Sequence, residues 1–224
     1  MMMVRIVGGH YNTVRATSMG SKSILQDAAE GRAIVQPWTV DLYHRAIAEG
    51  WLEESAAFEL LDGFIVRKDR AKAGEDLVTV GDRHRLAVQR LVKLAPRFEP
   101  LGHTLQVQQP IQLPPTNEPE PDGSVIRGTD DDYRNGPPGA ASVTCVVEVA
   151  DNSLSRDVGV KLHMYARAGI GQYVVIDLVH DVVLDHRKPA GDGYQQVASL
   201  RAGDAVELRA GEHGVSVPAT YLLP

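Results

Sequence analysis

The stretch that decides the fold is Val143–Leu178, VTCVVEVADNSLSRDVGVKLHMYARAGIGQYVVIDL. It begins with a nearly continuous apolar run, Val143–Ala150, which is typical of a central strand covered on both faces. A helix is expected to begin near Ser153, and Gly169 is placed to end it. A second apolar run, Tyr173–Leu178, predicts another buried strand. Strand, helix and strand in this order predict a right-handed βαβ unit with parallel strands.

The segments on either side of this unit predict the rest of a mixed sheet. Four short runs that follow it alternate with glycine-containing turns and read as antiparallel strands: VVLDHRK, YQQVASL, AVELR and VSV. Before it, SVIRG (residues 124–128) reads as a short strand, and TLQVQQPIQL (residues 104–113) alternates as a half-buried strand does. We therefore expect an α/β fold of mixed type, with a central mixed β-sheet flanked by helices.

The first part of the chain predicts two helices and a hairpin. Thr39 is a suitable N-cap for a helix that Gly50 ends, and Asp62-Gly63 between two apolar runs is a hairpin signal. A second helix is expected from Gly81 to Pro96, and its expected apolar stripe consists of Leu86, Val88, Leu91, Val92 and Leu94. Residues 1–36 show no sustained period, so we expect an N-terminal extension there and one domain over residues 37–224.

Composition narrows the class of protein. The chain has 224 residues, of which 43% are hydrophobic, so a core of ordinary size is possible. The single cysteine, Cys145, lies in an apolar run and is expected to be a buried small hydrophobe. There is neither a membrane-length apolar segment nor a signal-peptide pattern, which predicts a cytoplasmic location. The net charge of −6 argues against a large basic groove for nucleic acid.

Three residues of the predicted sheet and helix suggest metal chemistry. Asp122 opens a strand, Glu148 lies near the end of the central strand, and Lys161 is two turns into the next helix. Two carboxylates from adjacent strands can hold Mg²⁺, and a nearby lysine can orient water or neutralise a phosphate. Simpler interpretations are that Asp122 is a turn residue and that Lys161 is a surface lysine paired with Asp157.

The same residues carry a resemblance to a known family. PDG at Pro121–Gly123 and VVEVA at Val146–Ala150 resemble the PD-(D/E)XK nuclease superfamily. FELLDG, GDRHRLAVQRLV, PEPDG and especially VVEVADNSLSRDVGVKLHMYARAGIGQYVVIDL more closely resemble the Uma-two family, whose members are described as restriction endonucleases. The resemblance runs from about Thr39 to Arg187 and implies a restriction-endonuclease-like core.

The resemblance also implies roles for individual residues. The lysine that usually stands two residues after the glutamate is replaced by Ala150, and Lys161 matches the lysine that takes its place. Glu59 and His84 are implied to face the same site. The chain departs from the family pattern in GIGQYV, where Gly171 and Gln172 stand in place of the common proline and glutamate.

The leading hypothesis is a Mg²⁺-dependent endonuclease acting on DNA, with Mn²⁺ as a possible substitute. Asp122, Glu148 and the backbone carbonyl of Val149 would hold the metal, Lys161 would position the nucleophile, and Glu59 and His84 would assist. A homodimer is expected because cutting two antiparallel strands suits two-fold symmetry. The alternatives are an inactive or weakly active binding protein of the same fold and a hydrolase of small phosphoesters. A rim of basic side chains around the carboxylates would favour the nuclease; the candidates are Arg67, Lys68, Arg70, Lys72, Arg83 and Arg85.

Deleting residues 1–36 should change the melting temperature by less than about 3 °C, because a segment without periodicity contributes little to a packed core. Calorimetry on the full-length and shortened proteins measures this. A loss of about 8 °C or more would contradict the expectation, because it would mean that the segment packs into the core.

Overall fold

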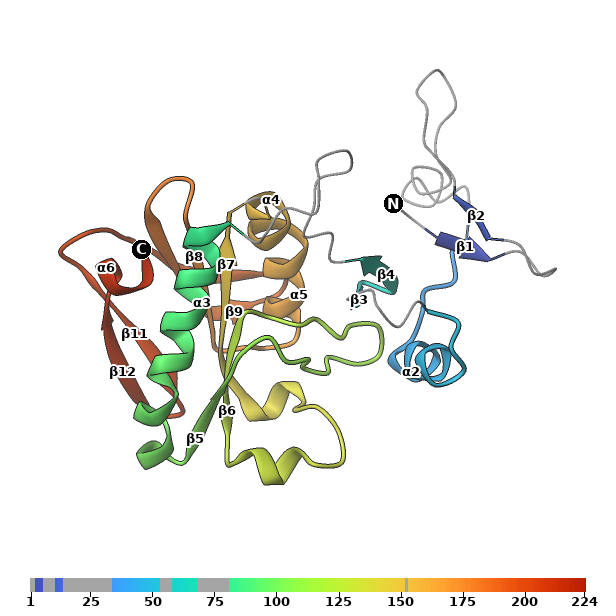
Figure 1. The fold of residues 1–224 in the computed structure, drawn as a ribbon, viewed down its shortest axis with the longest axis horizontal. Helices are drawn as coiled ribbons and strands as arrows, with labels where there is room; N and C mark the ends of the chain where they lie inside the picture. The colour runs from blue at the N-terminus through green and yellow to red at the C-terminus, as the bar shows by residue number, and fades with distance from the viewer. Residues whose placement is uncertain (1–2, 6–10, 14–33, 53–57, 68–80, 152) are drawn as a thin grey trace, which may run out of the picture. The chain divides into compact units, whose positions relative to one another are not determined.

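The computed structural model describes residues 3–5, 11–13, 34–52, 58–67, 81–151 and 153–224. The chain forms two compact units (Figure 1). Unit 1 comprises Met1–Lys68 and Pro114–Asn117, and unit 2 comprises Asp69–Leu113 and Glu118–Pro224.

Unit 1 contains one described helix and two two-stranded sheets. Helix α2 is Val40–Ala48, and the sheets pair β1 (Met3–Arg5) with β2 (Tyr11–Thr13) and β3 (Phe58–Leu61) with β4 (Phe64–Arg67). As expected, Thr39 caps α2, because its hydroxyl accepts a hydrogen bond from the backbone N–H of Leu42 at 3.2 Å. The β1–β2 pair lies in the range where the sequence showed no period.

The hairpin expected at Asp62-Gly63 is confirmed. Both residues have positive φ angles, 48° and 78°, which a two-residue turn between right-twisted strands requires. Aspartate tolerates this conformation, and glycine adopts it without a steric penalty. The turn joins β3 to β4 with Leu61 opposite Phe64.

Unit 2 is built on a six-stranded mixed sheet in the order β10-β9-β8-β7-β6-β5. Only β7 and β8 are parallel, and the helical segment between them makes the βαβ unit that the sequence predicted. The expected α/β fold with a central mixed sheet is therefore confirmed. The strands are β5 (His103–Gln106), β6 (Gly123–Arg127), β7 (Val143–Ala150), β8 (Gln172–Asp177), β9 (Val182–Ala190) and β10 (Gly193–Leu200).

Each face of this sheet is covered. Cys145, Val147 and Val149 of β7 pack in one core with helix α3 (Asp82–Leu94). The same core includes residues of the ribbon formed by β11 (Ala205–Ala210) and β12 (His213–Pro218) and of the short helix α6 (Ala219–Leu222). The intervening β7 residues face the crossover helix, which lies on the other side of the sheet from α3 (Figure 1). Both faces being covered explains the continuous apolar run.

Helix α3 buries a narrower stripe than expected. Ala87, Leu91 and Leu94 are buried at i, i+4 and i+7, whereas Leu86 and Val92 are 36% and 52% exposed. The expected stripe contained only leucines and valines and so missed Ala87, whose small side chain allows the helix to lie close to the sheet.

The crossover helix differs from the regular helix expected between Ser153 and Gly169. It consists of α4 (Leu154–Arg156), a π-helical turn (Asp157–Lys161) and α5 (Leu162–Arg167). A regular helix that begins near Ser153 would place Val158 against the sheet, but Val158 is 37% exposed, whereas Asp157 and Lys161 are buried. The buried face is polar at this turn because a carboxylate of the sheet, Glu148, lies opposite it.

Replacing the fully buried Leu91 with alanine should lower the free energy of unfolding by about 2–5 kcal/mol, because it leaves a cavity between α3 and the sheet. Val92→Ala on the same helix is the matched control and should change it by about 0.5 kcal/mol or less. Urea denaturation measures both, and equal effects would mean that α3 does not pack as described.

Candidate functional site

Asp122 directly precedes β6, and Glu148 lies near the end of the neighbouring strand β7. The antiparallel register pairs Gly123 with Val147, so one step further along the two chains Asp122 lies opposite Glu148. Opposed residues of antiparallel chains point to the same face, with Cβ atoms about 4.5–5.5 Å apart. The N–H of Val149, the residue after Glu148, donates to Asp122, so the two acidic residues predicted from the sequence lie at the same end of the sheet. Their convergence on one cation stays a prediction.

Asp122 is held by three donors. One oxygen, Oδ2, accepts a hydrogen bond from the backbone N–H of Val149 at 2.9 Å and lies 3.4 Å from Nε2 of His84. The other, Oδ1, accepts from the side-chain amide of Gln108 at 3.3 Å. Burial raises the pKa of Asp122, but the hydrogen bonds and charge from His84, with those from Val149 and Gln108, lower the pKa more in sum. Asp122 is therefore ionised at neutral pH.

Glu148 is buried and paired with a buried cation. Nζ of Lys161 donates to Oε1 of Glu148 at 2.8 Å, and the hydroxyl of Tyr165 donates to the same oxygen at 3.0 Å. The side chains of Glu148 and Lys161 are each 5% exposed. An isolated buried carboxylate is costly, so the ammonium supplies the compensation that Glu148 requires. Lys161 is therefore not the surface lysine of the simpler interpretation.

The π-helical turn brings these donors to the sheet. Asp157, Lys161 and Tyr165 form one buried row at intervals of four residues, with Lys161 at the end of the π-helical turn. The hydroxyl of Tyr173 on β8 donates to the backbone carbonyl of Asp157 at 2.9 Å, and Ser153 donates to the Asp157 carboxylate. Such widened turns are common at functional sites.

Tyr173 also reports on the charge of this region. Burial raises the pKa of its phenol well above the ordinary value, and the nearby charges of Glu148, Asp157 and Asp122 raise it further. Tyr173 therefore remains a protonated donor to the π-helical turn. The charges of both candidate metal ligands act on this one phenol.

The structure pairs four of the residues predicted from the sequence in two contacts, Lys161 with Glu148 and His84 with Asp122. That all four serve one site stays a prediction. Val149 contributes its N–H to Asp122, and the role proposed for its carbonyl stays a prediction. Glu59 is 1% exposed on β3 of unit 1, and its placement in the same site also stays a prediction. Sequence reasoning missed Tyr165 and Gln108; the spacing of Lys161 and Tyr165 at i and i+4 was the one available signal for Tyr165.

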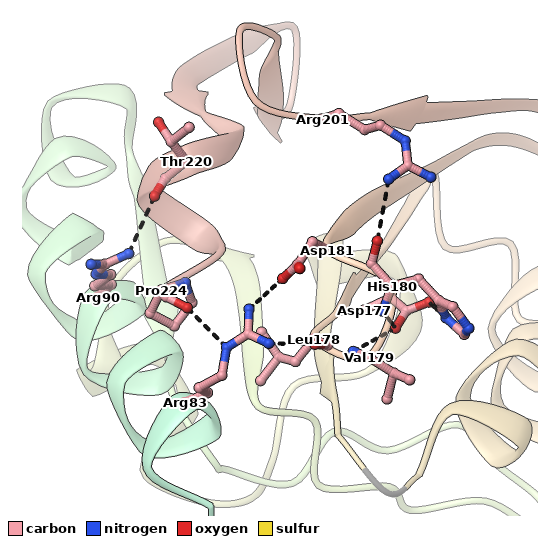
Figure 2. A network of polar contacts seen from close by, with 10 residues as sticks. All are labelled: Arg83, Arg90, Asp177, Leu178, Val179, His180, Asp181, Arg201, Thr220 and Pro224. Carbon is pink, nitrogen blue, oxygen red and sulfur yellow. Dashed lines mark hydrogen bonds and ion pairs between the residues drawn. The ribbon is translucent and has the colours of Figure 1, made fainter.

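Arg83, one of the proposed basic rim residues, has a structural role (Figure 2). Its guanidinium donates to the backbone carbonyls of Leu178 at 2.6 Å and Pro224 at 2.9 Å, and it pairs with Asp181. It thus ties α3 to the end of β8 and to the last described residue. Arg85 lies 3.6 Å from Asp82 on its own helix. Lys68, Arg70 and Lys72 lie outside the described residues, and Arg67 belongs to unit 1.

A second group of contacts in Figure 2 stabilises the turn after β8. Both oxygens of Asp177 are used: Oδ1 accepts from the N–H groups of Val179 and His180, and Oδ2 lies 2.7 Å from Nδ1 of His180. Arg201 donates to the carbonyl of His180 at 3.2 Å. These contacts are those of a capped turn.

The donor set at the strand ends fits a hard divalent cation. Within the part of the chain that the structure describes, no three His, Cys, Asp or Glu residues are grouped to hold a metal, so a protein-only cage of zinc type is not formed there. Mg²⁺ needs only one or two carboxylates, because it keeps several waters and takes further oxygens from a substrate. Asp122 and Glu148 are the candidates for those carboxylates. Among the described residues, no helix is long and apolar enough to cross a membrane.

Comparison with known proteins identifies the fold and the family. A solved structure described as a "putative nuclease belonging to DUF820" from Anabaena variabilis matches with a TM-score of 0.60 and 15% sequence identity, over 83% of this chain and 97% of that one. The protein therefore has a nuclease-like α/β fold. The family model Uma2, "Putative restriction endonuclease", matches residues 40–220, and the chain belongs to this family. No protein with a curated description is significantly similar to the chain.

The lowered pKa of Asp122 predicts a pH dependence of stability. Because its folded-state pKa is below its unfolded value, the unfolded state binds more protons and the stabilisation is present above the unfolded pKa. It is lost as the pH falls below about 4 and through the folded pKa. The stability difference between wild type and Asp122→Asn should therefore be constant near neutral pH and shrink in acid, as measured by urea denaturation. Parallel acid profiles for the two proteins would contradict this.

Proposed function

We propose that this protein is a Mg²⁺-dependent endonuclease that hydrolyses DNA phosphodiester bonds. The observation that carries the proposal is the ionised Asp122 opposite a buried Glu148 that is paired with Lys161. Membership of a family described as restriction endonucleases and a fold shared with a nuclease-like structure support it. Phosphoryl transfer is catalysed mainly by positioning and electrostatic stabilisation, and the carboxylates and the ammonium at these strand ends are groups that can supply both.

The proposed metal ligands are the carboxylates of Asp122 and Glu148 and the backbone carbonyl of Val149. Mg²⁺, or Mn²⁺ in its place, would supply a lowered pKa for a bound water and would offset charge on the phosphoryl group. The contacts from Val149, Gln108 and His84 keep Asp122 ionised and oriented before any cation binds. Ligating carboxylates that are themselves hydrogen-bonded are typical of tuned metal sites.

Lys161 is proposed to position the attacking water and to stabilise the negative charge on the phosphoryl oxygens. Its ammonium is kept at the site by Glu148, so no conformational search is needed before reaction. His84 is proposed to support Asp122, and its buried Nδ1 has no hydrogen-bond partner among the described residues. An assisting role for Glu59 is proposed from the family resemblance alone.

A homodimer is proposed as the working form. One chain offers one set of Asp122, Glu148 and Lys161, and two sets related by two-fold symmetry suit the cutting of both antiparallel strands of a duplex.

A catalytically weak binding or regulatory protein is the second candidate. It is favoured by the net charge of −6 and by Arg83, whose guanidinium is engaged by the protein's own carbonyls. Incubating the protein with supercoiled plasmid and Mg²⁺ or Mn²⁺ separates the two candidates. Nicking or linearisation that Glu148→Ala abolishes supports the nuclease, whereas binding without cleavage supports the second candidate.

Lys161→Ala should retain Mg²⁺ binding but cut plasmid at least about a hundredfold more slowly, because it removes one electrostatic stabiliser and leaves both carboxylates. Lys161→Arg should not restore the full rate, because a planar guanidinium does not replace a compact ammonium. Initial cleavage rates and Mg²⁺ titration measure the two effects separately. Cleavage by Lys161→Ala at the wild-type rate would rule out the role proposed for this lysine.

A further inference from the structure

Tyr165 contacts the candidate metal ligand Glu148 directly and was not expected to do so. Its hydroxyl donates to Oε1 of Glu148 at 3.0 Å, and its side chain is fully buried. Burial of a phenol is most favourable where its hydroxyl finds a partner, and here that partner is a carboxylate. The Tyr165 side chain therefore packs in the core and also contacts a residue of the candidate site.

Two donors from one helix hold the same oxygen. Lys161 and Tyr165 are four residues apart, so their side chains project from the same face and converge on Oε1 of Glu148. The terminal torsion of a glutamate is broad and roughly two-fold, so a carboxylate with one fixed oxygen loses most of its rotational freedom. Tyr165 and Lys161 together thus restrict the direction in which Glu148 presents its carboxylate.

The position of the Tyr165 hydroxyl is itself fixed by β8. The Tyr165 and Tyr173 rings lie 4.9 Å apart between centroids, and the Tyr173 hydroxyl donates to the Asp157 carbonyl in the π-helical turn. Tyr173 in turn stacks with His186 at 5.7 Å and with Tyr194 at 6.3 Å. Tyr165 therefore belongs to a connected set of packed aromatic rings.

We propose that Tyr165 is a positioning residue that sets the affinity of the site for a divalent cation through Glu148. This inference rests on the proposed metal site. The hydroxyl orders the Glu148 carboxylate before the cation binds, so cation binding does not have to bear the entropy cost of ordering it. Removing the hydroxyl takes away one of the two donors that hold Oε1 and leaves the ion pair with Lys161, so the carboxylate is less well ordered. Loss of a hydrogen bond to a ligating group typically weakens metal binding by about 10–100-fold.

Tyr165→Phe in the full-length protein tests the proposal, with Tyr194→Phe as the matched control. Tyr194 belongs to the same aromatic stack, but its hydroxyl donates at 3.0 Å to the backbone carbonyl of Ile170. Mn²⁺ is the probe, and free Mn²⁺ is measured by its paramagnetic resonance signal at a temperature well below the melting point of every variant. Tyr165→Phe should bind Mn²⁺ about 10–100-fold more weakly than wild type, and Tyr194→Phe within about twofold of it.

Three results would count against the proposal in distinguishable ways. Unchanged Mn²⁺ affinity in Tyr165→Phe overturns the role of the hydroxyl and leaves the metal site standing. Equal weakening in both variants overturns it too, because the effect would then come from general packing. Wild-type affinity in Glu148→Ala overturns the metal site itself, and the inference with it.

A measurement on the wild-type protein keeps the proposal testable if Tyr165→Phe does not fold. Mg²⁺ binding should perturb the hydrogen bond of the Tyr165 phenol, so a difference spectrum in the tyrosine absorption band should saturate with the same Kd as the binding curve. Tyr194→Phe should give the same difference spectrum. A flat spectrum in wild-type protein that binds Mg²⁺ at Glu148 overturns the proposal.

Discussion

The buried ion pair between Lys161 and Glu148 is the interaction on which the rest of the site depends. Both charged groups are removed from water, and breaking such a pair leaves an uncompensated buried charge. The pair therefore constrains three elements together: the end of β7, which carries Glu148, the π-helical turn, which carries Lys161, and β8, whose Tyr173 fixes that turn. The face of the crossover helix toward the sheet is polar at this point because the sheet presents a carboxylate there.

The sheet topology explains why one end of the fold collects the chemistry. Asp122 directly precedes β6, and Glu148 lies near the end of β7. Because β6 and β7 are antiparallel neighbours, the start of one strand and the end of the other lie at the same end of the sheet. The N–H of Val149, one residue beyond Glu148, points instead to Asp122. The two carboxylates are thus anchored differently, Asp122 by neutral amides and His84, and Glu148 by an ammonium and a phenol.

Local sequence patterns predicted the strands and turns of the fold well. They could not predict contacts between residues that are far apart in the sequence. The apolar runs around β7 and β8 and the Asp62-Gly63 turn depend on neighbouring residues, and all three were predicted correctly. The grouping of Asp122, Glu148 and Lys161 was suggested mainly by family resemblance. Periodicity placed Val158 on the sheet because it assumes that a buried face is apolar, which fails opposite Glu148. The structural contacts of Arg83, one of the candidate rim residues, could not be predicted from local patterns, because its partners lie 95 and 141 residues later. Glu59 and the boundary at residue 37 stay predictions.

The contacts of Arg83 also bear on the order in which the protein is assembled during synthesis. Helix α3 is made early, yet the carbonyls that anchor its first turn belong to Leu178 and Pro224. A nascent chain that has just produced α3 holds an amphipathic helix whose apolar face has no sheet to cover, since β7 and β8 come later. The packing of this helix on β7 and its contacts with Leu178 and Pro224 can form only after those residues have been made. Until then its exposed apolar stripe is a site for chaperone binding or for misassembly between nascent chains.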